Sequence, residues 1–66
     1  MKLIINGKPT ELDREMSIAE LLHIKGVDQA FVAVEHNLVW TKREDWSSTC
    51  LHENDRLEIV RVIAGG

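Results

Sequence analysis

The last three residues of the chain, Ala64, Gly65 and Gly66, have types and an order that suit one kind of chemistry. An α-carboxyl group is ionised at neutral pH, because its reference pKa is about 3.5, and it becomes an electrophile only after activation. Glycine has no Cβ, so Gly65 and Gly66 form an arm of up to roughly 7 Å that can enter a narrow channel. We therefore expect Gly66 to present a reactive carboxylate, with Gly65 and Ala64 threading the tail into a partner.

Cysteine and histidine, the other residues with reactive side chains, show no catalytic or metal-binding spacing. The single cysteine, Cys50, cannot form an internal disulfide, which agrees with a reducing compartment. We expect it to be a small buried or half-buried side chain rather than a nucleophile. His23, His36 and His52 fall on a predicted helix, a turn and a loop, so we expect no metal site, and we expect His52 to lie at the surface.

Length and composition favour one small soluble domain. A chain of 66 residues buries only about 60% of its unfolded surface, which leaves no room for an enzyme cleft. Its net charge of -3 would repel a phosphate backbone, so nucleic acid is not an expected partner. Apolar runs such as residues 31–34 are too short to span a bilayer, and the first residues lack a signal-peptide core. The chain is therefore expected to be cytoplasmic, with no membrane partner.

The N-terminal half predicts a hairpin followed by a helix. Residues 2–5 have strand character, Asn6-Gly7 suits a tight turn, Lys8-Pro9 should extend that turn, and residues 10–12 should return as a second strand. A capping box at residues 17–20 then predicts a helix over residues 18–25. The residues spaced to lie on one face of this helix are Ile18, Leu21, Leu22 and Lys25. Gly26 stands where the C-terminus of a helix favours a left-handed residue.

The C-terminal half predicts a second hairpin and a long last strand. Residues 30–34 read as a buried strand, His36-Asn37 as a turn and residues 38–40 as the returning strand. A second capping box, Thr41 to Glu44, predicts one helical turn that carries Trp46 into the core. Residues 56–63 form the longest strand-like segment, which we place centrally in a mixed sheet that packs on the helix.

Alternation along the last strand separates two faces near the tail. Leu57 and Ile59 share one face with Arg61, whereas Val60 and Val62 lie on the other. If the helix covers the first face, Val60 and Val62 form an exposed apolar patch that docks partners; alternatively, a central strand is buried on both faces. Arg61, and with it Lys42 and Arg43, could contact acidic rims on partners.

Several segments together resemble the ThiS family of sulfur carriers in thiamine biosynthesis. They are Asn6-Gly7 and residues 17–22, 32–37, 42–46 and 55–66, and the resemblance covers essentially the whole chain. It implies an α+β fold, the ubiquitin-like β-grasp: a mixed sheet of about five strands packed on one main helix. Residues 1–63 would form the domain and residues 64–66 a flexible tail.

The resemblance also implies a role as a co-substrate rather than an enzyme. A ThiF-like adenylating enzyme would use ATP to activate Gly66, a sulfur donor protein would supply sulfur for a thiocarboxylate, and a ThiG-like thiazole synthase would consume it. The carrier itself would bind no cofactor and would be a monomer between encounters. A molybdopterin-type sulfur carrier, a ubiquitin-like protein modifier and a passive interaction module are the alternatives that the same tail and fold leave open.

This chain departs from the ThiS pattern at two positions. Thr41-Lys42 stands where many relatives have a proline, and Asn54-Asp55 stands where they have Gly-Asp. Asparagine tolerates the left-handed region better than other non-glycine residues, so we expect the turn at Asn54 to keep its geometry.

Overall fold

The computed structural model describes residues 1–62. Its elements follow the predicted order of two strands, a helix and three strands. They are β1 (Lys2–Ile5), β2 (Lys8–Glu11), α1 (Ile18–Ile24), β3 (Val32–His36), β4 (Val39–Thr41) and β5 (Arg56–Arg61), with the short 3-10 helices η1 (Gln29–Phe31) and η2 (Arg43–Asp45). The predicted boundary between domain and tail, at residues 63 and 64, lies outside the described residues.

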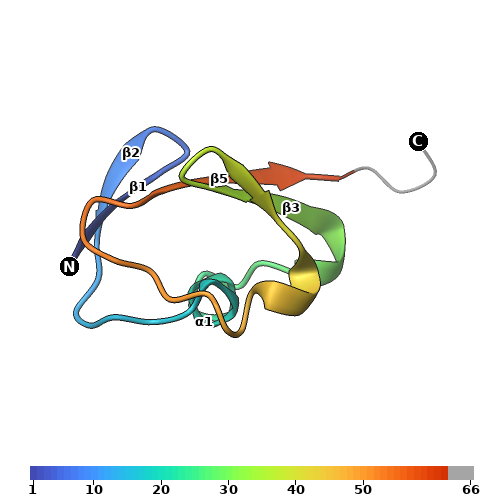
Figure 1. Cartoon of the computed structure of the whole chain (residues 1–66), viewed down its shortest axis with the longest axis horizontal. Coiled ribbons are helices and arrows are strands. Elements are labelled where there is room, and N and C mark those ends of the chain that lie inside the picture. Colours follow the sequence, from blue (N-terminus) through green and yellow to red (C-terminus); the bar gives the residue numbers. More distant parts are fainter. Residues whose placement is uncertain (63–66) are drawn as a thin grey trace.

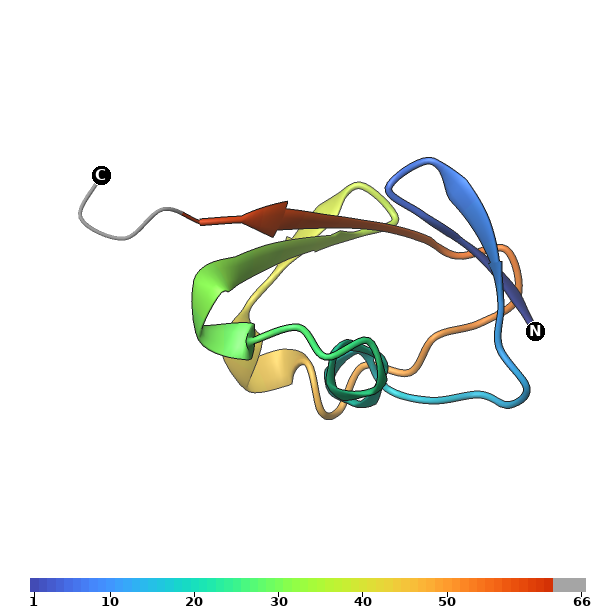
Figure 2. The same ribbon diagram turned by 180° about the vertical axis from the view of Figure 1, so that it is seen from behind.

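The five strands form one mixed sheet in the order β2-β1-β5-β3-β4. β5 is central, parallel to β1 and antiparallel to β3. Helix α1 and the segments that flank it lie on one side of this sheet in both views (Figures 1 and 2). The mixed five-stranded sheet, its single main helix and the central last strand are therefore confirmed, as is the β-grasp arrangement.

The first hairpin turns more tightly than predicted. Asn6 and Gly7 both have positive φ, 51° and 80°, which is the geometry of a two-residue hairpin turn. Lys8 therefore pairs directly with Ile5, and β2 begins at Lys8 rather than at residue 10. Pro9 is tolerated inside β2 because this strand is at the edge of the sheet, where a missing N–H breaks no second ladder.

The start and the end of α1 follow the predicted signals, with one exception. The Ser17 hydroxyl accepts a hydrogen bond of 3.1 Å from the Glu20 N–H, and Gly26 follows the helix with a φ of 71°. The glutamate half of the capping box is wrong, because the Glu20 carboxylate pairs with Arg14 instead. Lys25 is exposed rather than part of the apolar stripe; the buried helical residues are Ile18, Leu21 and Leu22.

The core lies between α1 and the sheet, and the second capping box is not formed. Trp46 is 2% exposed, which confirms it as a core residue, and its indole N–H donates to the Thr41 carbonyl at 2.8 Å. Thr41 ends β4, where it pairs with Val34, and its hydroxyl donates to the Val39 carbonyl instead of capping a helix. Helix η2 begins instead after Lys42, without a side-chain cap.

Strand β3 begins two residues later than predicted. The Asp28 carboxylate accepts a hydrogen bond of 3.0 Å from the Ala30 N–H and starts η1, which takes Ala30 and Phe31 out of the strand. The turn that follows β3 is formed by Asn37 and Leu38, both with positive φ. Asn54 also has a positive φ, 69°, so the expected left-handed geometry at this position is confirmed.

Candidate functional site

The central strand β5 holds the base of the C-terminal tail in the sheet. Beyond Arg61, its last residue, the Val62 N–H still donates to the Phe31 carbonyl at 2.8 Å. The backbone is therefore fixed by the sheet up to Val62 on its β3 side. The predicted reactive residues, Ala64, Gly65 and Gly66, lie outside the described residues, so the structure describes the base from which the tail starts.

On its other side, β5 is held by a side chain that the sequence did not reveal. The ladder with β1 ends at Leu57, but the Asn6 side chain continues it by one residue pair. Its Oδ1 accepts from the Ile59 N–H at 2.7 Å, and its Nδ2 donates to the Ile59 carbonyl at 3.3 Å. The Asn6 side chain thus replaces the hydrogen bonds that one more strand residue would make. As a result, β5 is hydrogen-bonded on both sides as far as Ile59, two residues before Arg61.

The three predicted docking residues do not share one surface. Val60 and Val62 lie on the face of the sheet away from α1 and are 45% and 48% exposed. The alternative, a central strand buried on both faces, is therefore wrong. Arg61 lies on the α1 side, where it lines a groove of about 620 Å³ together with Asp28 and Phe31. A docking role for any of them stays a prediction.

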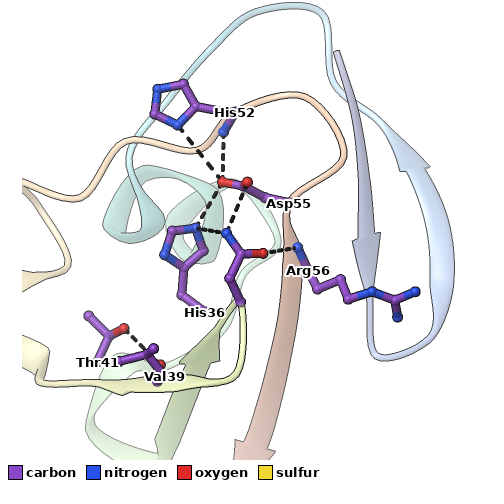
Figure 3. Close-up of polar contacts among 7 residues, drawn as sticks. His36, Val39, Thr41, His52, Asp55 and Arg56 are labelled. Atoms are coloured by element: carbon purple, nitrogen blue, oxygen red, sulfur yellow. Dashed lines mark hydrogen bonds and ion pairs between the residues drawn. The ribbon is translucent and has the colours of Figure 1, made fainter.

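A polar cluster fixes the start of β5 to the turn between β3 and β4 (Figure 3). Asp55 Oδ2 accepts from His36 Nε2 at 2.8 Å and from the His52 N–H at 2.9 Å, while Asn37 Nδ2 donates to Asp55 Oδ1 at 3.1 Å. The Asn37 Oδ1 in turn accepts from the Arg56 N–H at 2.8 Å. The predicted surface position of His52 is confirmed, whereas His36 is half-buried in this cluster.

The carboxyl group of Asp55 is the charged centre of this cluster. Burial raises the pKa of the Asp55 carboxyl, but the hydrogen bonds from His36, Asn37 and the His52 N–H outweigh burial and hold the pKa below its ordinary value. The folded protein therefore favours the ionised carboxylate more than the unfolded chain does. This difference stabilises the fold when Asp55 is ionised in both states, and it is lost as the pH falls through the folded pKa.

We expect the substitution Asp55→Asn to lower the free energy of unfolding by about 1–3 kcal/mol at pH 7, the usual effect of losing hydrogen bonds to a charged group. Below about pH 5 the gap to the wild type should narrow, because protonated Asp55 then resembles asparagine. Urea unfolding of the wild type and the variant at pH 7 and at pH 3 measures the difference in free energy of unfolding at each pH. Asp13→Asn, at an exposed position, is the control. A gap that is the same at both pH values would show that the charge of Asp55 does not contribute.

Cys50 lies on the surface and belongs to no cluster of possible metal ligands within residues 1–62. Cys50 is exposed, so its predicted burial is wrong, and the next residue, Leu51, is the one that enters the core. Within residues 1–62, His, Cys, Asp and Glu side chains form no group of three or more that could hold a metal ion. No helix in that range is long and apolar enough to cross a membrane.

Comparison with known proteins places this chain among short proteins and among segments of longer ones. A thiazole synthase from Paramagnetospirillum magneticum is 39% identical to it over 66 residues, and one from Magnetococcus marinus is 33% identical over 66 residues. The chain is covered completely but spans only 20% of the length of each of these two relatives. An uncharacterized protein, ycf40 of Pyropia yezoensis, is 32% identical over 94% of this chain and 87% of its own length.

Solved structures agree in fold over the whole chain. The crystal structure of the thiamine biosynthesis protein ThiS from Geobacter metallireducens covers 100% of both chains, with a TM-score of 0.88 and 35% sequence identity. A solution structure of a thiamine biosynthesis protein from the same organism covers 100% of this chain and 88% of its own, with a TM-score of 0.81 and 35% identity. The model of the ThiS family matches residues 3–66. The chain therefore belongs to the ThiS family.

Proposed function

We propose that this protein is a sulfur carrier of thiamine biosynthesis, and that the carboxylate of Gly66 is adenylated and then converted to a thiocarboxylate. The observation that carries the proposal is the hydrogen bonding of β5 on both sides close to its end, by Asn6 and by Phe31. The base from which the tail starts is therefore held in place by hydrogen bonds. Membership of the ThiS family and the similarity to a thiamine biosynthesis protein support the same function.

The chemistry requires two partner-catalysed steps at Gly66. A carboxylate oxygen attacks the α-phosphorus of ATP, pyrophosphate leaves, and an acyl-adenylate forms. A sulfide-level nucleophile then attacks the acyl carbon, a C–S bond forms, and the C–O bond to AMP breaks. ATP is thus a substrate of the adenylating enzyme, while the carrier contributes one unhindered carboxylate and a folded surface by which it is recognised. In this role the carrier is a co-substrate and not a catalyst.

Thiazole synthase is the expected acceptor of the sulfur. The support comes from two relatives named thiazole synthase, in which a segment similar to this whole chain makes up 20% of the length. When two activities act in sequence, joining them in one polypeptide raises the effective concentration of one for the other. We therefore propose that the present chain meets a separate thiazole synthase and donates its thiocarboxylate sulfur there.

Intact-mass spectrometry tests the carrier function directly. The protein is incubated with the adenylating enzyme of the same organism, ATP and sulfide, and we expect the mass to rise by the difference between one sulfur and one oxygen atom. Omitting ATP is the control and should leave the mass unchanged. An unchanged mass in the full reaction, with an enzyme that forms the adenylate of another carrier, would contradict the proposal. A protein modifier would instead appear in immunoblots of cells as larger conjugates.

A further inference from the structure

Both hairpin turns of the fold begin with an asparagine whose side chain binds the backbone of β5. Asn6 and Asn37 are exposed, and their φ angles are 51° and 50°. The Asn6 Oδ1 accepts from the Ile59 N–H at 2.7 Å, and the Asn37 Oδ1 accepts from the Arg56 N–H at 2.8 Å. The two turns lie beside β5 in both views (Figures 1 and 2). The two asparagines therefore support one strand at two points, of which Ile59 is the closer to the tail.

The contact of Asn6 with β5 is more than its turn requires. A two-residue turn with positive φ is equally open to glycine, which adopts this conformation without strain. Glycine, however, has no side chain that could reach β5. The Asn6 amide meets both backbone groups of one residue, because it accepts from the Ile59 N–H and also donates to the Ile59 carbonyl. The turn explains the conformation of Asn6, but it does not explain this pair of hydrogen bonds.

Without the Asn6 side chain, the last part of β5 would be hydrogen-bonded on one side only. Backbone pairing with β1 ends at Leu57, whereas pairing with β3 continues to Arg61. Two-stranded ribbons twist more strongly than larger sheets, and segments with few hydrogen bonds open locally at a low cost in free energy. Asn6 extends the support on the β1 side to Ile59, which is three residues, roughly 10 Å, before Val62.

Resting on the proposed function, we infer that Asn6 is a positioning residue for the loading of sulfur: by binding Ile59 it holds the base of the tail where the Gly66 carboxylate can reach the adenylating centre. The four residues after Val62 can span at most about 14 Å, so the position of the base limits what the carboxylate reaches. Asn6 touches no reacting atom and acts through β5. Its loss should therefore slow the chemical step more than it weakens binding to the enzyme.

The substitution Asn6→Gly tests this role, because glycine keeps the turn and removes both hydrogen bonds to Ile59. Initial rates of thiocarboxylate formation are measured by intact mass over a range of carrier concentrations, with adenylating enzyme, ATP and sulfide, at a temperature where the variant is folded. We expect kcat to fall by about fivefold or more and KM to stay within about twofold of the wild type. In the free carrier, amide hydrogen exchange at Val62, measured by NMR, should be about fivefold or more faster.

The matched control is Asn37→Gly, which makes the same change at the same φ but removes support from β5 at Arg56, six residues before Val62. Its unfolding midpoint should fall at least as far as that of Asn6→Gly, because it also loses a hydrogen bond to the Asp55 carboxylate. Its kcat and its Val62 exchange should nevertheless stay within about twofold of the wild type.

Equal kcat values for the two glycine variants would overturn the inference, whether neither value falls or both fall alike. Val62 exchange that is unchanged in Asn6→Gly would overturn it as well. A wild-type carrier that gains no sulfur from an active adenylating enzyme would contradict the proposed function instead. The exchange measurement needs no enzyme, so a failure of the carrier function and a failure of the role of Asn6 are distinguishable.

Discussion

Deleting Gly66 should reduce thiocarboxylate formation by at least about 10²-fold while the domain stays folded. The deletion shortens the arm by one residue, about 3.5 Å, and a displacement of even 1 Å from the productive geometry can cost 10²-fold in rate. The remaining carboxylate, on Gly65, would be held short of the activating centre. The rate of mass increase in the presence of adenylating enzyme, ATP and sulfide measures the effect.

A second variant, Gly65→Val, distinguishes the effect of the length of the C-terminal arm from the effect of its bulk. It keeps the carboxylate on Gly66 but places a β-branched side chain in the arm, and we expect a loss of similar size because valine restricts the backbone and widens the tail. Thermal unfolding is the control for both variants. The midpoint should not change, because both positions follow Val62, the last residue with a described hydrogen bond into the sheet. A full reaction rate in the deletion variant would rule out Gly66 as the reactive residue.

Local patterns predicted most of the elements but not all of their boundaries. Asn6-Gly7 predicted a turn and Ser17 a helix start because both signals act over two to four residues. The second capping box failed for the opposite reason. Thr41 has the right residue type, but it belongs to β4, where it pairs with Val34 seven residues away, and helix η2 starts only after Lys42.

The hydrogen bonds that fix β5 connect parts of the chain that are far apart. Asn6 and Ile59 are 53 residues apart, and the Asp55 cluster joins a turn after β3 to the residues just before β5. The spacing of residues within one short segment cannot predict such contacts. The same holds for the contact between Asn37 and Arg56, because it depends on the register between β3 and β5. By contrast, alternation within β5 alone was enough to separate Arg61 from Val60 and Val62.

Replacing Trp46 with alanine should have the largest effect on stability of any single substitution considered for this protein. Trp46 is 2% exposed and belongs to the buried core cluster, and truncating a buried tryptophan costs about 3–5 kcal/mol. A domain of this size has a total stability of roughly 3–10 kcal/mol. We therefore expect Trp46→Ala to leave the protein largely unfolded at 37 °C, as measured by urea and thermal denaturation.

Two controls resolve what Trp46 contributes. Trp46→Phe keeps an aromatic ring but leaves the Thr41 carbonyl without its 2.8 Å donor, so it should show an intermediate loss, about 1–3 kcal/mol. Trp40→Ala removes the same side chain from an exposed position on β4 and should cost less than about 1 kcal/mol. If Trp40→Ala destabilised the fold as much as Trp46→Ala, the core assignment of Trp46 would be wrong. The expected contrast follows because the cost of truncating a tryptophan depends on how much of it is buried.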